Sequence, residues 1–386
     1  MRHQQQHHVN VCENVQFSQT NPKDKSGMEN NTNRLKLFLL GGISSIAWLC
    51  YFRSRRSSRR PNIQPPEPCN KENGYYTQLS KGRTFYRFYN EHCSSKLPPI
   101  VLCHGFMGSS EYLIPLIEAL LPTQRRIYAL DLYGRGHSDC VDDDYNYDLF
   151  TEQISELLDA LAISSPIDLV GGGIVVQFGA HNLPFLRSLT LIAPVGLPSM
   201  TVGPSSSLKL ILKLLKYCSY TLYGGYLHEW LTAKVLQPSD EIIGEGWSRV
   251  DTSRFQWYKK HMLRRFANEK NTLPRAVAST LLNLPFDSLS ESYGAIGNGN
   301  SNSNSNSQQH MRSLCTAEDA TLLSPRVLVM WGENDQAVPC DRDGVQRHIP
   351  QAQILTWPNE GHMLPVELAE EVGEKILEFW QPLEET

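Results

Sequence analysis

From residue 75 onward, short apolar runs alternate with helical segments, and this alternation limits the possible folds more than any other feature of the chain. Six runs have the length and composition of buried strands: residues 99–103, 126–130, 167–171, 188–192, 326–331 and 353–357. Helical patterns lie between or after them, among them residues 111–121, 147–161 and 367–380. Continuous apolar strands separated by helices predict an α/β fold with a mostly parallel central sheet and helices on both faces. Ligands of such sheets bind at the carboxyl ends of the strands.

Composition excludes several classes of protein. The 386 residues include 36 basic and 40 acidic side chains, which gives a formal net charge of -4. With 40% hydrophobic and 20% charged residues, the chain has the composition of a protein with a packed core, not of a disordered, collagen-like or polytopic membrane protein. Nothing in the charge balance indicates a nucleic-acid partner. The nine cysteines are odd in number and lack CxxC spacing, so we expect neither a disulfide framework nor a metal site, and no cofactor.

The first 74 residues differ in character from the rest. Residues 1–33 are polar and rich in Gln, Asn and His, which predicts a disordered tail. Residues 34–53 contain sixteen uncharged residues flanked by basic ones, which as a helix would span about 24 Å. That is short of the roughly 30 Å hydrocarbon core, but the flanking basic side chains can snorkel. We expect a single-pass membrane anchor here, with an organelle-targeting segment and an interfacial helix as alternatives.

A basic linker rich in Pro and Ser follows at residues 54–74. Five arginines just after the apolar run, against two basic residues just before it, place the C-terminal side of the anchor in the cytosol by the positive-inside bias. The expected location is therefore a membrane, with the folded domain on the cytosolic side.

The strand-helix alternation stops between residues 199 and 324. This stretch carries an amphipathic pattern at residues 207–217, several aromatic segments, and a low-complexity run of Gly, Asn and Ser at residues 297–307. It predicts a helical cap inserted into a core formed by residues 75–198 and 325–386, with a disordered loop near its end. We interpret the aromatic residues as cap core in preference to substrate contacts.

Four segments with strong local signatures each lie at the carboxyl end of a predicted strand: residues 103–110, 131–138, 331–339 and 359–365. The second is a glycine-rich turn, in which we interpret Asp131 and His137 as structural. The third contains Asp335 and the fourth His362, which lies 27 residues further on. An acid and a histidine at the same edge of a sheet form the arrangement in which a carboxylate orients an imidazole as general base. Each segment alone is a weak signal, but together, in register with the strands, they are strong.

With these motifs, residues 75–381 resemble the α/β-hydrolase superfamily. The matching motifs are the HG loop, the D-x-x-G-x-G-x-S turn, the GENDQAVP loop and the GHMLPVE loop. The resemblance implies that Asp335 is the acid and His362 the base of a catalytic triad. It also implies that His104, Gly105 and Phe106 form an oxyanion loop, in which the amide of Phe106 is one donor. It implies further that residues 199–324 form a lid. The HGF sequence is similar to that of the lipase, esterase and C-C hydrolase branch, which carries HGF in place of HGGG.

The chain departs from the family pattern at the nucleophile. Family members carry G-x-S-x-G on a sharp turn from strand to helix. Here the strand at 167–171 and the helical pattern at 174–180 are separated by Gly172 and Gly173, so no nucleophile stands where one is expected, between Gly171 and Gly173. About three or four residues are missing relative to the family pattern. Either a short in-frame or gene-model deletion removed the serine from a working hydrolase, or the loss is old and the protein is a pseudoenzyme; the intact acid and histidine loops favour the first.

The resulting expectation is a hydrolase of carboxylic esters with an apolar, lipid-like acyl group, a class suggested by the apolar cap helix and the membrane segment. The alternative is a catalytically inactive protein that uses the capped pocket to bind a ligand or a partner. An epoxide hydrolase or dehalogenase ranks lower, because its aspartate nucleophile would occupy the same missing turn.

Overall fold

The computed structural model describes residues 73–93, 95–164, 166–200, 205–206, 209–210, 212–213, 273–299 and 325–384. The chain divides into two units, Met1–Asn62 and Ile63–Thr386, and all of these residues belong to the second. The predicted tail, the anchor at 34–53, nearly all of the linker and most of the cap lie outside the described residues. Within the described part, no helix is both long and apolar enough to cross a bilayer.

The centre of the second unit is an eight-stranded sheet with the order β1-β2-β4-β3-β5-β6-β7-β8. Its strands are β1 (Gly74–Gln78), β2 (Arg83–Tyr89), β3 (Ile100–Cys103), β4 (Ile127–Leu130), β5 (Ile167–Gly171), β6 (Leu186–Ile192), β7 (Arg326–Gly332) and β8 (Gln353–Trp357). Strands β3 to β8 pair in parallel, and β1 and β2 are antiparallel to their neighbours. The six predicted strands and the mostly parallel sheet are confirmed.

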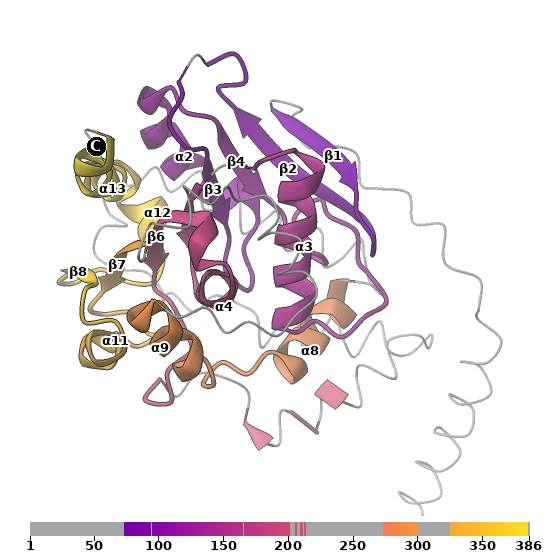
Figure 1. Ribbon diagram of the computed structural model, residues 1–386. Coiled ribbons are helices and arrows are strands. Elements are labelled where there is room, and N and C mark those ends of the chain that lie inside the picture. Colours follow the sequence, from indigo (N-terminus) through magenta and orange to yellow (C-terminus); the bar gives the residue numbers. More distant parts are fainter. Residues whose placement is uncertain are drawn as a thin grey trace, which may run out of the picture. The chain divides into compact units, whose positions relative to one another are not determined.

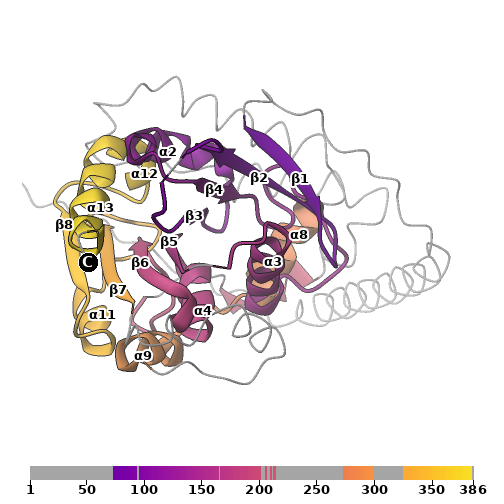
Figure 2. The same cartoon turned by 45° about the horizontal axis from the view of Figure 1, so that its top comes forward.

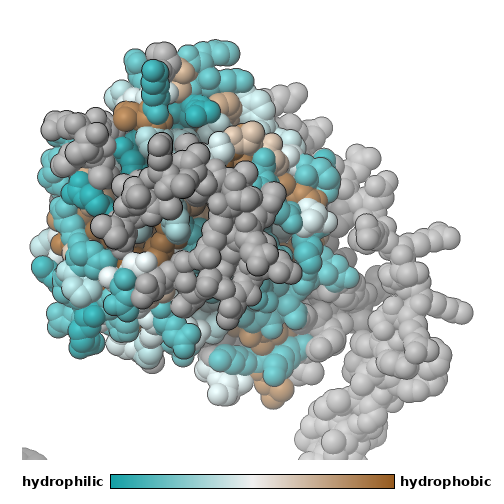
Figure 3. Space-filling view, viewed as in Figure 1, coloured by the Kyte–Doolittle hydropathy of each residue, from teal (hydrophilic) through white to brown (hydrophobic). Residues whose placement is uncertain are grey.

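Helices cover both faces of this sheet (Figures 1 and 2). One face carries α2 (Ile114–Leu120), α12 (Leu364–Glu367) and α13 (Ala369–Glu384), and the other carries α3 (Tyr147–Ala160), α4 (Gly173–His181), α9 (Ser290–Asn298) and α11 (Arg342–His348). The strand side chains form two apolar clusters, one under each helical layer, which explains why the parallel strands are apolar without alternation. On the face shown in Figure 3, hydrophilic residues prevail over the coloured surface.

The direction of winding reverses at β3. Strand β4 follows β3 in the chain and pairs with one edge of it, whereas β5 follows β4 and pairs with the other edge. In open α/β sheets, the connections that leave such a switch point diverge and open a crevice at the carboxyl ends of the strands. The fold therefore places the segment after β3 and the turn after β5 side by side: a Cβ built on Gly171 would lie 2.5 Å from the carbonyl oxygen of Cys103.

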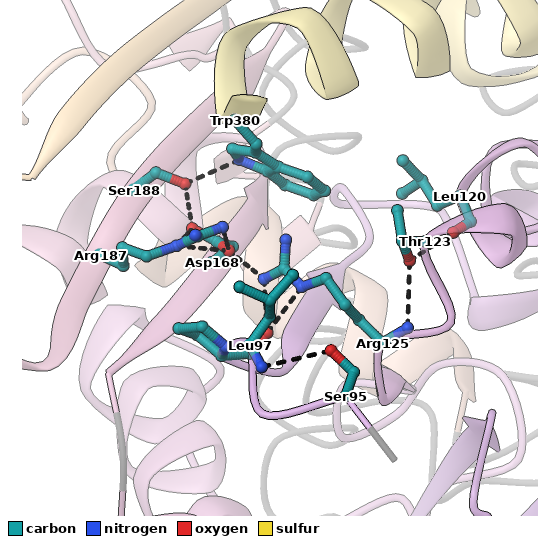
Figure 4. Close-up of polar contacts among 10 residues, drawn as sticks. Ser95, Leu97, Leu120, Thr123, Arg125, Asp168, Arg187, Ser188 and Trp380 are labelled. Atoms are coloured by element: carbon teal, nitrogen blue, oxygen red, sulfur yellow. Dashed lines mark hydrogen bonds and ion pairs between the residues drawn. The ribbon is translucent and has the colours of Figure 1, made fainter. Parts of the chain in front are cut away.

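A buried ion network closes the opposite, amino-terminal end of the parallel strands (Figure 4). Asp168 on β5 pairs with Arg125 and with Arg187, whose Nε lies 3.0 Å from both carboxylate oxygens. Ser188 on β6 donates to the same carboxylate and accepts a 2.9 Å hydrogen bond from the Trp380 indole. The network therefore connects β5, β6 and α13 at the end of the sheet opposite to the carboxyl ends of the parallel strands.

Two helices of the predicted cap are described, α8 (Leu273–Asn283) and α9. Helix α9 packs on α4, where Ser292 donates a 2.6 Å hydrogen bond to Gln177. Helix α8 packs on the loop after β4, where Ser279 accepts a 3.2 Å hydrogen bond from the amide of Tyr145. The α8 and α9 segments of the predicted cap are thus helical, and both pack on the core.

Candidate active site

Asp335 is held by the backbone of its own loop, directly after β7. The amide of Asp335 donates to the carbonyl of Gly332, and the amides of Ala337 and Val338 donate to Asp335 Oδ1 at 2.8 Å each. The buried Trp331 indole donates to the carbonyl of Val338 at 2.9 Å and fixes the far end of the turn. One carboxylate oxygen is thus committed to the loop, which leaves Oδ2 to orient another group.

The loop that carries His362 is joined to this acid loop. The amide of Asn334 donates to the carbonyl of Glu360 at 3.0 Å. At Gly332 a Cβ would lie 2.3 Å from the carbonyl oxygens of both Glu360 and Gly361, so glycine is required for this close approach. The two loops following β7 and β8 therefore form one rigid edge.

Asp335 and His362 meet at this edge. Asp335 Oδ2 lies 2.8 Å from His362 Nδ1; the aspartate side chain is fully buried, and the histidine side chain is 32% exposed. Because an ionised carboxylate can only accept, Nδ1 carries the proton of this hydrogen bond and the lone pair of a neutral imidazole is on Nε2. This is the arrangement of a general base whose ring is oriented by an acid.

The segment after β3 contains a histidine with a fixed tautomer. His104 is buried, its Nε2 accepts a 3.0 Å hydrogen bond from the amide of Leu132, and its Nδ1 lies 2.7 Å from the carbonyl oxygen of Gly105. Nε2 therefore has no proton, and Nδ1 donates to Gly105. Burial lowers the pKa of His104 to about 4, which keeps the ring neutral.

This histidine sets the direction of a backbone amide. The carbonyl of Gly105 accepts from His104 and, at 3.0 Å, from the amide of Gly108. The described residues contain no cis peptide bond, so the N–H of Phe106 points away from that fixed carbonyl. His104 thus fixes the orientation of the Phe106 amide, the oxyanion donor expected from the sequence. A Cβ at Gly105 would meet nothing within 4 Å, so space is open beside the loop.

The shifted pKa of His104 predicts a loss of stability in mild acid. The unfolded chain binds a proton on this side chain below about pH 6.5, whereas the folded chain binds it only below about pH 4. The contribution of the neutral His104 to the free energy of unfolding is therefore complete above pH 6.5. It declines as the pH falls toward 4, by up to about 3 kcal/mol. Urea unfolding at pH 7 and at pH 5 measures this difference in the free energy of unfolding. The difference should be smaller in His104→Gln. An equally steep pH dependence in His104→Gln would contradict the assignment.

The turn after β4 is organised by Asp131. Its buried carboxylate accepts from the amide of Ser110 at 2.5 Å and from the amide of His137 at 2.7 Å. Ser138 donates to the carbonyl of Asp131 and accepts from the amide of Phe85. Both carboxylate oxygens of Asp131 thus accept hydrogen bonds from backbone amides, as expected of a residue with a structural role.

Gly136 makes this turn possible, and its substitution is expected to be costly. Its φ is +48°, and a Cβ would lie 1.9 Å from Asp131 Oδ2. Gly136→Ala should lower the free energy of unfolding by at least about 2 kcal/mol, because left-handed strain adds to displacement of the carboxylate. Gly105→Ala, where the Cβ meets nothing, is the matched control for thermal melting. Equal melting temperatures for the two variants would refute this explanation.

The turn between β5 and α4 is where the sequence pattern led us to expect a nucleophile. Gly172 is the N-cap of α4, and its carbonyl accepts from the amides of Val175 and Val176. Cβ atoms at Gly171 and Gly173 would lie 2.5 and 2.6 Å from neighbouring atoms, whereas one at Gly172 would have a single neighbour at 3.7 Å. The turn is therefore one residue long, closely packed on both sides, and open at Gly172.

The thiol of Cys103 is close to this turn but is not activated as a nucleophile. Cys103 ends β3 beside this turn, but it is buried and its Sγ lies 3.7 Å from the carbonyl oxygen of His104. Burial raises the pKa of Cys103 to about 12, so the reactive thiolate is not formed near neutral pH.

Comparison with known proteins agrees with this geometry. A family profile described as "alpha/beta hydrolase fold" matches residues 98–217. The matched segment contains β3 to β6 and agrees with an α/β-hydrolase fold for this chain. An acetyltransferase component of the acetoin cleaving system of Pseudomonas putida is 24% identical over 285 residues, 73% of this chain. The match spans 63% of that relative's own length.

Solved structures show the same fold at lower identity. A thermophilic esterase from Thermogutta terrifontis has a TM-score of 0.56 and 18% identity, covering 80% of this chain and 98% of the esterase. The enol-lactonase from Burkholderia xenovorans has a TM-score of 0.57 and 15% identity, covering 80% of this chain and all of the lactonase (100%). The predicted α/β-hydrolase fold is thus confirmed.

One buried residue of the site was not singled out by the sequence. Arg135 lies within the D-x-x-G-x-G-x-S sequence after β4, and its Nε donates to the carbonyl of Phe106 at 2.6 Å. A cation inside a turn of small residues, directly after a buried strand, is the signal that could have identified it.

Proposed function

We propose that this protein has the site of a serine-type hydrolase of carboxylic esters, from whose written sequence the nucleophile is missing. The observation that carries the proposal is the 2.8 Å contact between the buried Asp335 carboxylate and His362 Nδ1, which directs Nε2 away from the acid. An imidazole oriented in this way serves to take a proton from a nucleophile and to return it to a leaving group.

The oxyanion loop supports acyl transfer in particular. An ester acquires negative charge on its carbonyl oxygen in the transition state, and backbone amides that are already oriented stabilise it without reorganisation. The amide of Phe106 has such a fixed direction because His104 and Gly108 hold the Gly105 carbonyl. The esterase and enol-lactonase among the structural neighbours further support a carboxylic ester as the substrate.

An apolar acyl group is the substrate that fits the described side chains. Val277 on α8 packs against Phe106 and Met107, directly over the oxyanion loop, with Cys140 and Leu281 in the same cluster. Burial of each methylene of an acyl chain against such a surface contributes about 0.8 kcal/mol. We therefore propose lipid-like acyl esters, and with them a membrane anchor at residues 34–53 that keeps the domain on the cytosolic side of its membrane.

The chain as written has no acyl-enzyme route, because the turn at Gly172 holds no Ser, Cys or Asp. His362 can still activate water, but members of a triad act as a unit and the activity left after removal of one is far lower. The intact acid and histidine edge favours a deletion from a working hydrolase over an ancient loss.

The tryptic peptide from Gly136 to Arg187 decides this point, because no Lys or Arg lies between those ends. Mass spectrometry of the protein purified from its source should find this peptide longer by three or four residues, including a serine. A peptide with the mass of the written sequence would reject a working serine hydrolase.

A second candidate is a pseudoenzyme that binds a ligand in the capped pocket. The observation in its favour is the turn itself: Gly172 caps α4 directly, and Gly171 and Gly173 are tightly packed, so the turn without a serine is a complete structure. This candidate predicts saturable binding of an apolar ester by the written chain that His362→Ala leaves unchanged. Isothermal titration with a non-hydrolysable ether analogue tests it.

A further inference from the structure

Arg135 connects the oxyanion loop with the cap. Its buried guanidinium donates from Nε to the carbonyl of Phe106 at 2.6 Å and from one terminal nitrogen to Thr280 Oγ1 on α8 at 2.8 Å. The other terminal nitrogen donates to the carbonyl of Gly134 at 3.1 Å, and the guanidinium carbon lies 5.3 Å from the centre of the Phe106 ring. A planar fork with fixed donors is suited to hold such partners together.

The hydroxyl of Thr280 takes part in two hydrogen bonds. It donates to the carbonyl of Ala276 one turn earlier at 2.8 Å, so its lone pairs remain to accept from Arg135. The hydrogen bond therefore depends on α8 lying in its docked position. Thr280 and Arg135 are 145 residues apart, and one side chain joins cap and loop across that separation.

Helix α8 is also docked by contacts that do not involve Arg135. Ser279 accepts from the amide of Tyr145 at 3.2 Å, and the Asn283 side chain donates to Asp144 Oδ1 at 3.2 Å. These contacts lie beside the Arg135 connection on the same helix, so docking of α8 and its connection to the oxyanion loop can be separated by substitution.

We propose that Arg135 is a positioning residue that makes the geometry of the oxyanion loop depend on docking of α8. The Gly105 carbonyl is fixed by His104 and Gly108, and Arg135 fixes the next carbonyl, that of Phe106. With both flanking peptide planes held, the Phe106 amide has one orientation when α8 is docked. When α8 leaves, the guanidinium loses an acceptor in a buried site and its hold on Phe106 is weakened.

The kinetic consequence rests on the proposed function, but the structural consequence does not. Hydrogen exchange of the segment 104–108 can be measured in the chain as it exists. In a chain with a serine restored to the turn, loss of the connection should lower kcat and leave KM nearly unchanged, because the oxyanion donor acts mainly in the transition state.

The test compares Thr280→Val, which removes the hydroxyl with little change of volume, with Thr280→Ser, which retains it, and with Ser279→Ala as the matched control. Thr280→Val should raise exchange in segment 104–108 about tenfold and lower kcat of the restored chain about tenfold. Thr280→Ser should leave the exchange rate and kcat close to those of the chain with Thr280, and Ser279→Ala should change neither of them. Arg135→Lys, which retains the charge and loses the fork, should act like Thr280→Val.

Two results would overturn the proposal: unchanged exchange in both Thr280→Val and Arg135→Lys, or an equal increase in Ser279→Ala, which would show a general effect of α8 docking. If the restored chain has no esterase activity, the proposed function fails while the exchange measurement still decides the role of Arg135.

Discussion

A chain with Ala-Ser-Ala inserted between Gly171 and Gly172 is expected to hydrolyse p-nitrophenyl esters, whereas the written sequence is not. The insertion creates Gly-Ala-Ser-Ala-Gly after β5, at the strand-to-helix turn where the superfamily carries its nucleophile. The insertion is placed beside Gly172 because a Cβ there would have a single neighbour at 3.7 Å, whereas Gly171 and Gly173 are tightly packed. The proposed acid and base, Asp335 and His362, already contact each other, and the proposed oxyanion loop follows β3, the strand that pairs with β5.

His362→Ala in the restored chain should lower kcat by about 10⁴-fold or more, because a triad without its base loses most of its advantage over water. An Ala-Ala-Ala insertion is the control for the length of the turn, and it should be as inactive as the written sequence. Restored protein that folds, has an unchanged melting temperature and cleaves neither short nor long acyl esters would reject the esterase proposal.

The second large effect is expected at the other end of the strands, at Asp168. Asp168→Ala removes the carboxylate between Arg125 and Arg187 and leaves two buried guanidinium groups without their counter-ion. Removal of one partner from a buried ion pair lowers the free energy of unfolding by about 3–5 kcal/mol. Arg125 also donates to the carbonyl of Pro98 at 2.8 Å, so this change would disturb the entry to β3 as well.

Ser188→Ala is the control in the same network. It removes one neutral hydroxyl, which donates to Asp168 and accepts from Trp380, and should cost about 1–2 kcal/mol. Denaturant midpoints of the two variants and the unaltered chain separate the charge effect from the hydrogen bond. An Asp168→Ala midpoint equal to that of Ser188→Ala would contradict a charge-centred role for the network.

The parallel core could be predicted from the sequence because its strands are buried on both faces, so their apolar runs are continuous. Strands β1 and β2 were not predicted. Strand β2 reads RTFYRFY, and the charge of its buried Arg87 is balanced by Glu111, 24 residues away, which only the fold reveals. The predicted helix at 111–121 is split into a 3₁₀ turn, Ser110–Leu113, and α2, because Pro115 is in the first turn of α2.

The part of the candidate site that follows from the order of strands and loops along the chain could be predicted from the sequence. Asp335 and His362 lie in loops after consecutive strands, and parallel strands bring such loops to one edge. The tautomer of His104 was not predictable, because it depends on the amide of Leu132 in another loop. The role of Arg135 depends on Thr280 in the inserted cap, a contact that no local motif encodes.

The most direct test of the central claim is labelling of the Ala-Ser-Ala chain with a fluorophosphonate, followed by location of the adduct by mass spectrometry. The reagent reacts with a serine whose proton is taken by an oriented base, so it reports the assembled site without knowledge of the substrate. We expect one adduct, on the inserted serine, that disappears in His362→Ala. Absence of this adduct, or labelling that persists without His362, would contradict a serine-hydrolase site built on Asp335 and His362.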